Sequence, residues 1–341
     1  MNTGIVYSDK YLEHDLGPDH PEKPERLKSI IESLKREEKL LEKIDIFEPS
    51  PASIEDIKLA HTPAYIEKIK KLSKSGRRVD LDTPINKKTF DLALLSAGGT
   101  LQLGEKTLKG KFGNGFALVR PPGHHATRDS GGGFCYFNNI AITARKLLKE
   151  DEIDRVLIFD FDAHHGNGTQ DIFYQDNNLL YISFHQSGRT LYPGTGSPKE
   201  TGEKDGEGYT VNVPFPPGSS DENYVAALKK FLIPLSEQFE PDFILSSVGL
   251  DGHRKDPLTN LRLSSKGYEW LGKTSIDQAS KLCDGKIVFV LEGGYAIDAS
   301  TKSVLKIMNA LVNPSSPDLP KGEKKPVFEK VKENLSPYWD L

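Results

Sequence analysis

The stretch V-L-I-F-D-F-D-A-H-H-G-N-G-T-Q, residues 156–170, sets the fold class of this chain. Its first four residues are apolar, which is typical of a strand buried on both faces of a sheet. Acidic and imidazole side chains follow at once, and Gly166 and Gly168 then allow a sharp turn. Ligands bind outside the carboxyl ends of the strands in an open α/β sheet. The stretch therefore predicts a central strand that ends in a functional site.

Asp162 and His164 stand two positions apart, so both side chains leave the same face of an extended backbone. A carboxylate and an imidazole that converge at a strand end are suitable ligands for zinc or manganese. The alternative is a turn in which these side chains only cap backbone groups. The density of acidic and imidazole groups argues against a turn alone, because such groups seldom gather without a charge to hold.

Further apolar runs read as strands, and helical patterns separate them. The strand-like runs are 4–7, 116–119, 179–184, 209–213, 243–248 and 287–291. The helical patterns are 24–36, 54–61, 64–72, 88–108, 138–149, 222–239, 300–311 and 327–335. This alternation predicts an α/β fold with three layers, α/β/α, around a mainly parallel central sheet. The length of 341 residues fits a single domain over residues 1–341.

Composition excludes several classes of protein. The 45 basic and 49 acidic residues leave a net charge of −4, which indicates no direct binding to nucleic acid. No apolar run approaches the ~20 residues that span a membrane, and no signal peptide is visible. Two cysteines, Cys135 and Cys283, are too few for a disulfide framework and fit a cytoplasmic location. The sequence indicates no particular oligomeric state.

A catalytic zinc site usually has three protein ligands and one open position. Asp256 is the preferred third ligand, because it follows an apolar strand on a glycine-bearing loop and Pro257 stiffens its backbone. Asp251, on the same loop, is the alternative. Alternatively, Asp256 forms an Asx turn ahead of the proline and has a structural role only.

Acid and base groups lie in two other loops. His124 and His125 follow Pro-Pro-Gly, and imidazole suits both proton abstraction and proton donation near neutral pH. Asp160 and Asn167 are candidate partners of the two rings, and the different partners predict different protonation states. Tyr295 follows two glycines, which leaves its phenol free to donate to a developing oxyanion.

Together these residues resemble the histone deacetylase family. That family lies within the arginase/deacetylase fold, with acetylpolyamine amidohydrolases and acetoin-utilisation proteins. The matching blocks are H-P-E-K-P-E-R (20–26), L-D-T-P (81–84), R-P-P-G-H-H-A (120–126), G-G-F-C-Y-F-N-N (132–139), D-F-D-A-H-H-G-N-G-T-Q (160–170), S-F-H (183–185), D-P (256–257) and L-E-G-G-Y (291–295). The asparagine in H-H-G-N-G resembles the class II and bacterial or archaeal branch.

The resemblance implies one catalytic zinc ion held by Asp162, His164 and Asp256. It implies His124 and His125 as the acid–base pair with Asp160 and Asn167 behind them, and Tyr295 as the group that polarises the amide. The implied substrate-binding residues are Asp82, Gly133, Phe134, Tyr192 and Leu258. The implied residues of an inner potassium site are Asp160, Asp162, His164, Ser183 and Phe184. The implied residues of an outer potassium site are Phe173, Asp176, Leu179 and Tyr209.

The implied reaction is zinc-dependent hydrolysis of the acetyl or acyl amide on the ε-amino group of lysine in a protein or peptide. Deacetylation of acetylpolyamines is the alternative, although Leu258 stands where polyamine-specific relatives tend to have an acidic gatekeeper. A two-manganese ureohydrolase and a catalytically silent acyl-lysine binding protein are further alternatives. Fe(II) can replace Zn(II) in such a set of oxygen and nitrogen ligands.

Overall fold

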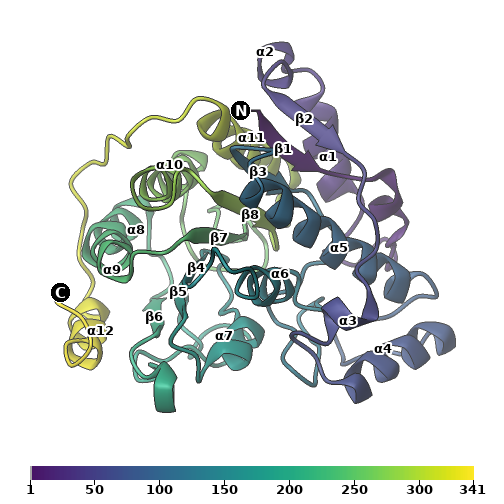
Figure 1. Cartoon of the computed structure of the whole chain (residues 1–341), viewed down its shortest axis with the longest axis horizontal. Coiled ribbons are helices and arrows are strands. Elements are labelled where there is room, and N and C mark those ends of the chain that lie inside the picture. The colour runs from purple at the N-terminus through teal and green to yellow at the C-terminus, as the bar shows by residue number, and fades with distance from the viewer. Residues whose placement is uncertain (1) are drawn as a thin grey trace.

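The computed structural model describes residues 2–341 and contains one sheet of eight parallel strands (Figure 1). The strands lie in the order β2-β1-β3-β8-β7-β4-β5-β6, and every neighbouring pair is parallel. Their bounds are β1 Thr3–Val6, β2 Ile44–Phe47, β3 Asn114–Ala117, β4 Val156–Asp160, β5 Leu179–Gln186, β6 Thr210–Phe215, β7 Phe243–Val248 and β8 Ile287–Leu291. A parallel sheet brings all carboxyl ends to one edge, which is where the polar motifs of the sequence fall.

Helices cover both faces of the sheet and complete the expected three-layer α/β/α architecture (Figure 1). On one face α5, α6 and α7 pack on the strands, and on the other α10 and α11 do so, with α1 against α11 and α8 against α10. The helix bounds are α1 Glu25–Leu34, α2 Glu38–Leu41, α3 Ile54–Ile57, α4 Pro63–Ser75, α5 Thr89–Leu108, α6 Asn139–Leu147, α7 Asn167–Phe173, α8 Asp221–Ala227, α9 Ile233–Phe239, α10 Ser265–Leu282, α11 Ile297–Val312 and α12 Val327–Leu335. One π-helical turn, Leu228–Leu232, joins α8 to α9.

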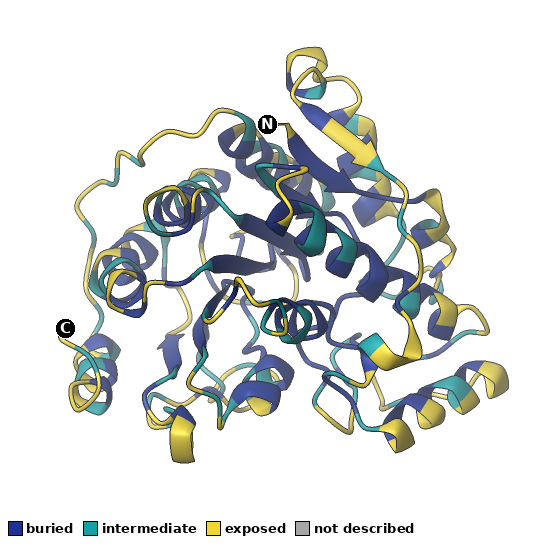
Figure 2. Ribbon diagram, in the orientation of Figure 1, coloured by how far each residue is buried: buried dark blue, intermediate teal, exposed yellow. Residues whose placement is uncertain are grey.

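The central strands β4, β7 and β8 are buried along their whole length (Figure 2). Their apolar side chains therefore face helices on both sides, which explains why their sequences show no alternation of apolar and polar residues. The predicted runs 243–248 and 287–291 coincide with β7 and β8.

Four strands or α-helices were not predicted: β2, α10 and the short helices α2 and α7. The edge strand β2 is short and partly exposed, so its sequence I-D-I-F carries little hydrophobic signal. The 18-residue helix α10 contains Gly267 and Gly272, which weaken a helical pattern. A Cβ at Gly272 would lie 3.0 Å from Ile307 of α11, so this glycine allows the two helices to approach closely.

The carboxyl-terminal part of the chain covers the edge of the sheet that strand β6 forms. Helix α12 lies against β6, and the Trp339 indole donates a hydrogen bond of 2.7 Å to the Gly208 carbonyl. Cys135 and Cys283 are both buried and unpaired. Within residues 2–341, no helix combines the length and the apolar character that crossing a bilayer requires.

Candidate active site

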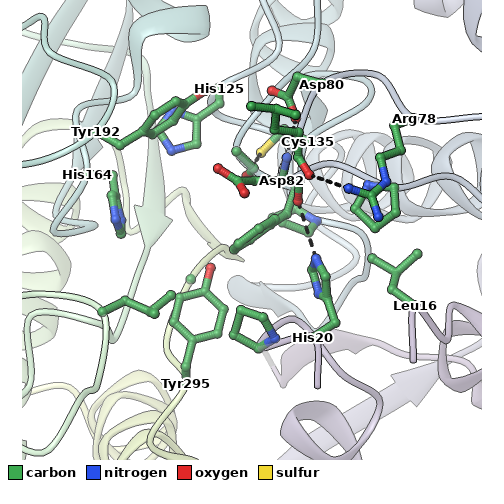
Figure 3. A pocket seen from close by; sticks show the side chains of 18 of the residues that line it. Leu16, His20, Arg78, Asp80, Asp82, His125, Cys135, His164, Tyr192 and Tyr295 are labelled. Carbon is green, nitrogen blue, oxygen red and sulfur yellow. Dashed lines mark hydrogen bonds between the residues drawn. The ribbon is translucent and has the colours of Figure 1, made fainter. Parts of the chain in front are cut away.

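Side chains from several strand ends meet in a cavity of about 760 Å³ at the carboxyl edge of the sheet (Figure 3). The loop after β3 contributes His124 and His125, the end of β4 contributes Asp162 and His164, and the end of β8 contributes Tyr295. Residues separated by more than 170 positions therefore face one space. The parallel sheet produces this convergence because all these loops leave the same edge.

Asp162, His164 and Asp251 form one compact group of possible metal ligands. One ligand atom from each lies within 4.8 Å of the others. Both carboxylates are fully buried, and His164 Nδ1 lies 2.7 Å from Asp251 Oδ2 and 3.1 Å from Asp162 Oδ1. Burial opposes a charge on His164, but Asp251 and Asp162 outweigh it and raise the pKa of the imidazole to about 10. Two buried carboxylates and one imidazole that converge in this way are ligand types that suit a metal ion.

Asp256, the preferred third ligand in the sequence analysis, follows Asp251 on the same loop after β7. The Asp256 carboxylate accepts hydrogen bonds from the backbone N–H groups of Leu258, Tyr295 and Ala296. Asp251 Oδ1 accepts the Ala163 N–H at 2.9 Å, and its other oxygen faces His164. Asp256 as the third metal ligand stays a prediction, and Asp251 stays the alternative.

Two glycines make room for the buried carboxylates. A Cβ at Gly249 would lie 1.8 Å from Asp162 Oδ2, and one at Gly293 would lie 2.6 Å from oxygens of both Asp162 and Asp251. The Gly293 N–H donates to Asp162 Oδ2 at 3.0 Å. The glycines of the G-G-Y motif thus let the backbone approach the ligand group closely, and the tyrosine of the motif provides the phenol.

The two histidines of the loop after β3 lie side by side, with ring centroids 4.1 Å apart. His124 Nδ1 lies 3.1 Å from Asp160 Oδ2, and His125 Nδ1 lies 2.8 Å from Asn167 Oδ1, so the structure assigns each expected partner to one ring. Burial disfavours charge on His124, but Asp160 and Asp162 outweigh it and raise the pKa of His124 to about 10. Burial, followed by the nearby His124, lowers the pKa of His125 well below its usual value. The pair therefore consists of one charged and one neutral ring near neutral pH.

Tyr295 directs its hydroxyl into the cavity, toward the side that carries His164 and His125 (Figure 3). Its ring meets Phe134 edge to face at a centroid distance of 5.9 Å, and the Arg26 guanidinium lies 4.8 Å from its centroid. Burial raises the pKa of the phenol well above its usual value, so Tyr295 remains a hydrogen-bond donor.

The family model of the histone deacetylase domain matches residues 20–311 of this chain. The chain belongs to the histone deacetylase family. Its relatives among known proteins agree: a probable deacetylase of Archaeoglobus fulgidus is 46% identical over 302 residues, which are 88% of this chain and 83% of that protein. Chloroplastic histone deacetylase 10 of Oryza sativa is 38% identical over 315 residues, which are 87% of this chain and 70% of that protein.

Solved structures place the fold in the same family. The crystal structure of the HDA15 HD domain matches with a TM-score of 0.90 and 32% identity, over 99% of this chain and 95% of that one. The single parallel sheet with helices on both faces is thus the arginase/deacetylase fold that the sequence predicted. The protein is accordingly a hydrolase of the deacetylase type.

The five expected substrate-binding residues of this deacetylase all line the cavity. They are Asp82, Gly133, Phe134, Tyr192 and Leu258. Tyr192 and Leu258 are 46% and 37% exposed, which places them at the mouth, whereas Phe134 lies deeper beside Tyr295. The loop that carries Tyr192 is anchored by His165, whose Nδ1 lies 2.8 Å from the Thr195 hydroxyl.

The expected potassium residues of this deacetylase lie in two places. Asp160 and Ser183 are register partners at the carboxyl ends of β4 and β5, so the inner set is contiguous. The outer set, Phe173, Asp176, Leu179 and Tyr209, lies at the end of α7, before and at the start of β5, and just before β6. The Asp176 carboxylate pairs with Arg145 at 2.6 Å.

A buried network of charged side chains lies beneath the site, and the sequence analysis did not predict its role. Arg26, from the H-P-E-K-P-E-R block, donates to the carbonyls of Glu292 and Gly294 at 2.6 Å each. Glu22 receives Arg26 at 2.9 Å and Arg120 at 2.6 Å, and both guanidinium groups are buried. The block at residues 20–26 thus holds the loop that carries Tyr295. Four charged residues in this seven-residue block were the available signal, but most of their partners are far away in sequence.

Replacing Glu22 with glutamine is expected to destabilise the fold by about 3–5 kcal/mol, because two buried guanidinium groups would lose their shared counter-charge. Burial raises the pKa of Glu22, but Arg120 and Arg26 outweigh it and lower the pKa from 4.5 to about 2. A lowered folded-state pKa means that this stabilisation is present at neutral pH and is lost as the pH falls from about 4.5 toward 2.

Urea unfolding at pH 7 and at pH 3 measures both effects. Wild type should lose this contribution on acidification, and Glu22→Gln should lack that part of the pH dependence. Glu67→Gln is the control, since Glu67 pairs with Lys70 at 3.9 Å on an exposed helix surface. Equal stability of Glu22→Gln and wild type at pH 7 would contradict the assigned role of the network.

Proposed function

We propose that this deacetylase is a zinc-dependent amidohydrolase that removes acetyl groups from the ε-amino group of lysine in proteins or peptides. One observation carries the proposal: a single cavity is lined by Asp162 and His164 of the ligand group, by the paired His124 and His125, and by the Tyr295 phenol. This combination of a metal-ligand set, an acid–base pair and an oxyanion donor matches what amide hydrolysis requires.

Asp162, His164 and Asp256 would hold the ion, and Asp251 is the alternative to Asp256. Two carboxylates and one imidazole leave the open position that a catalytic zinc needs, and the same set also suits Fe(II). A bound zinc ion would polarise the amide carbonyl and lower the pKa of a bound water. We also propose that potassium binds at the two residue sets described above, where it would stabilise the ends of β4 and β5.

Side chains of the protein carry out the proton transfers. His125 is uncharged because its pKa is low, so it can accept a proton from the attacking water and deliver one to the leaving amine. His124 remains charged beside Asp160 and stabilises negative charge that develops next to it. The Tyr295 hydroxyl donates to the carbonyl oxygen as that oxygen gains charge.

The cavity mouth favours acyl-lysine over an acylated polyamine. Phe134 and Tyr192 provide apolar walls for an alkyl chain, and Leu258 offers no counter-charge to a second ammonium group. An acetylated polyamine is the second candidate, because Asp19, Asp80 and Asp82 also line the cavity.

Competition between an acetyl-lysine peptide and acetylspermidine tests this proposal. We expect the zinc-loaded enzyme to prefer the peptide in kcat/KM and to lose activity in a chelator. Leu258→Glu should raise relative kcat/KM for acetylspermidine about tenfold, the effect of one ion pair of ~1.4 kcal/mol. A polyamine preference of the wild type would overturn the substrate class, and full activity after complete removal of metal would overturn the zinc mechanism.

A further inference from the structure

The Glu292 carboxyl group is buried and binds the backbone of the loop that carries the two histidines. The residue is 1% exposed, and its Oε2 accepts the N–H of Gly123 at 2.7 Å and that of His124 at 3.2 Å. The two preceding residues are prolines and have no N–H group, so these are the first amides that the histidine loop, residues 121–126, can offer. A buried amide without a partner costs about 1–3 kcal/mol. Glu292 is therefore the acceptor for both amides.

The backbone of Glu292 is itself held firmly. The residue directly follows β8, its N–H donates to the Val248 carbonyl at 2.9 Å, and its carbonyl accepts Arg26 at 2.6 Å. The same chain reaches Tyr295 three residues later. Glu292 thus connects the histidine loop to the loop that carries the phenol.

The other bonds of the histidine loop involve its carbonyl groups. The Asn139 side chain donates to the Pro121 carbonyl at 3.1 Å, and the Thr169 N–H donates to the His124 carbonyl at 3.1 Å. A Cβ at Gly123 would lie 2.5 Å from the Asn139 nitrogen, so the loop also packs closely against the start of α6. These contacts leave the direction of the Gly123 and His124 amides to Glu292.

We propose that Glu292 is a positioning residue for His124 and His125, which fixes their loop relative to Tyr295. The carboxyl group binds the backbone of the histidine loop, so it acts on the rings through the direction of the chain. This inference rests on the proposed function, in which the two histidines and Tyr295 act on one amide group.

The positioning requires an acceptor oxygen and does not require a charge. Burial raises the pKa of the Glu292 carboxyl from 4.5 to about 7, although the nearby His124 opposes this shift. Glu292 Oε1 has no hydrogen-bond partner within residues 2–341, so it can carry a proton while Oε2 keeps both N–H bonds. A glutamine carbonyl can occupy the place of Oε2 without a charge. Substitution can therefore separate the acceptor from the charge.

Glu292→Gln and Glu292→Leu test the inference with an acetyl-lysine peptide. Leucine fills a similar space but accepts no hydrogen bond. We expect kcat to fall about 10- to 100-fold in Glu292→Leu with little change in KM, because a displacement of about 1 Å can cost a factor of up to about 10². Glu292→Gln should retain most of the wild-type kcat. Glu292→Ala, in which water can reach the same amides, replaces Glu292→Leu if that variant does not fold.

Asp242→Leu is the matched control. Asp242 Oδ2 also accepts the N–H groups of two consecutive residues, Asp154 at 2.9 Å and Arg155 at 2.8 Å. Asp242 precedes β7, at the opposite end of the strand from the cavity. Its replacement removes a comparable pair of hydrogen bonds and should leave kcat unchanged.

Two measurements separate positioning from general structural damage. In a double-mutant cycle, Glu292→Leu should reduce kcat far less in a His125→Ala background than in wild type, because a group that it positions is already absent. Amide hydrogen exchange of residues 123 and 124 should be at least about tenfold faster in Glu292→Leu, which is the loss of protection expected when a hydrogen bond is removed. The same amides should exchange at nearly the wild-type rate in Glu292→Gln.

An equal loss of kcat in Glu292→Gln and Glu292→Leu would assign the effect to charge and overturn the inference. Additive effects in the cycle, or unchanged exchange at residues 123 and 124 in Glu292→Leu, would also overturn it. The exchange measurement needs no turnover, so it decides whether Glu292 restrains the histidine loop even if the wild type hydrolyses neither substrate. That last result would overturn the proposed function alone.

Discussion

Asp256→Ala is expected to lose its bound zinc and to reduce kcat/KM for an acetyl-lysine peptide by about 10³-fold or more. The expectation follows from the proposed ligands Asp162, His164 and Asp256: the Asp256 side chain is nearly buried, and its hydrogen-bond partner Tyr295 lines the same cavity as the other two ligands. Removal of one of three ligands leaves a carboxylate and an imidazole, which bind a metal ion weakly. A metal contributes several kcal/mol to the transition state, and each 1.36 kcal/mol corresponds to a factor of ten.

Elemental analysis after dialysis, together with steady-state kinetics, measures this effect. Asp251→Ala is the informative comparison, because it removes the neighbouring aspartate of the same loop. If Asp256→Ala retains one zinc per chain and Asp251→Ala loses it, Asp251 is the third ligand.

Tyr295→Phe is expected to reduce kcat by about 10²- to 10³-fold, the usual cost of removing one oxyanion donor. The substitution deletes only the hydroxyl, and the ring can keep its contacts with Phe134 and Arg26. Zinc content and KM should therefore change little, because the lost interaction is made mainly in the transition state.

The control for this variant is Tyr338→Phe. The Tyr338 hydroxyl lies 3.2 Å from Glu207 at the surface near the C-terminus, so its removal should leave kcat unaffected. Turnover of Tyr295→Phe at the wild-type rate would remove the phenol from the proposed reaction. Loss of zinc in this variant would instead show that Tyr295 has a structural role in the ligand group.

Several parts of the site could be read from short segments of sequence. Asp160 and Asn167 were predicted as partners of the two histidine rings because their chemistry complements imidazole, and the structure pairs Asp160 with His124 and Asn167 with His125. The strands before the motifs were apolar enough to be recognised, so the motifs could be placed at strand ends. Strand β2 and helix α10 were missed because the first is short and partly exposed and the second contains two glycines, and the short helices α2 and α7 were missed as well.

The role of the H-P-E-K-P-E-R block could not be derived from its own residues. Glu22 and Arg26 act through Arg120 and through carbonyls of residues 292 and 294, which are about 100 and 270 positions away. Local patterns report secondary structure, whereas a buried ion pair depends on which surfaces the fold brings together.

The sequence by itself determined the α/β class, the edge of the sheet where chemistry gathers, and the kinds of group found there: carboxylates, imidazoles and a phenol. These follow from local periodicity and from the ordering of strands and motifs, which need no knowledge of distant contacts. Only the tertiary structure decided which groups contact Asp251 and Asp256. The two lie five positions apart on one loop, and their hydrogen bonds, from Ala163 to the first and from Tyr295 and Ala296 to the second, depend on how distant loops fold together.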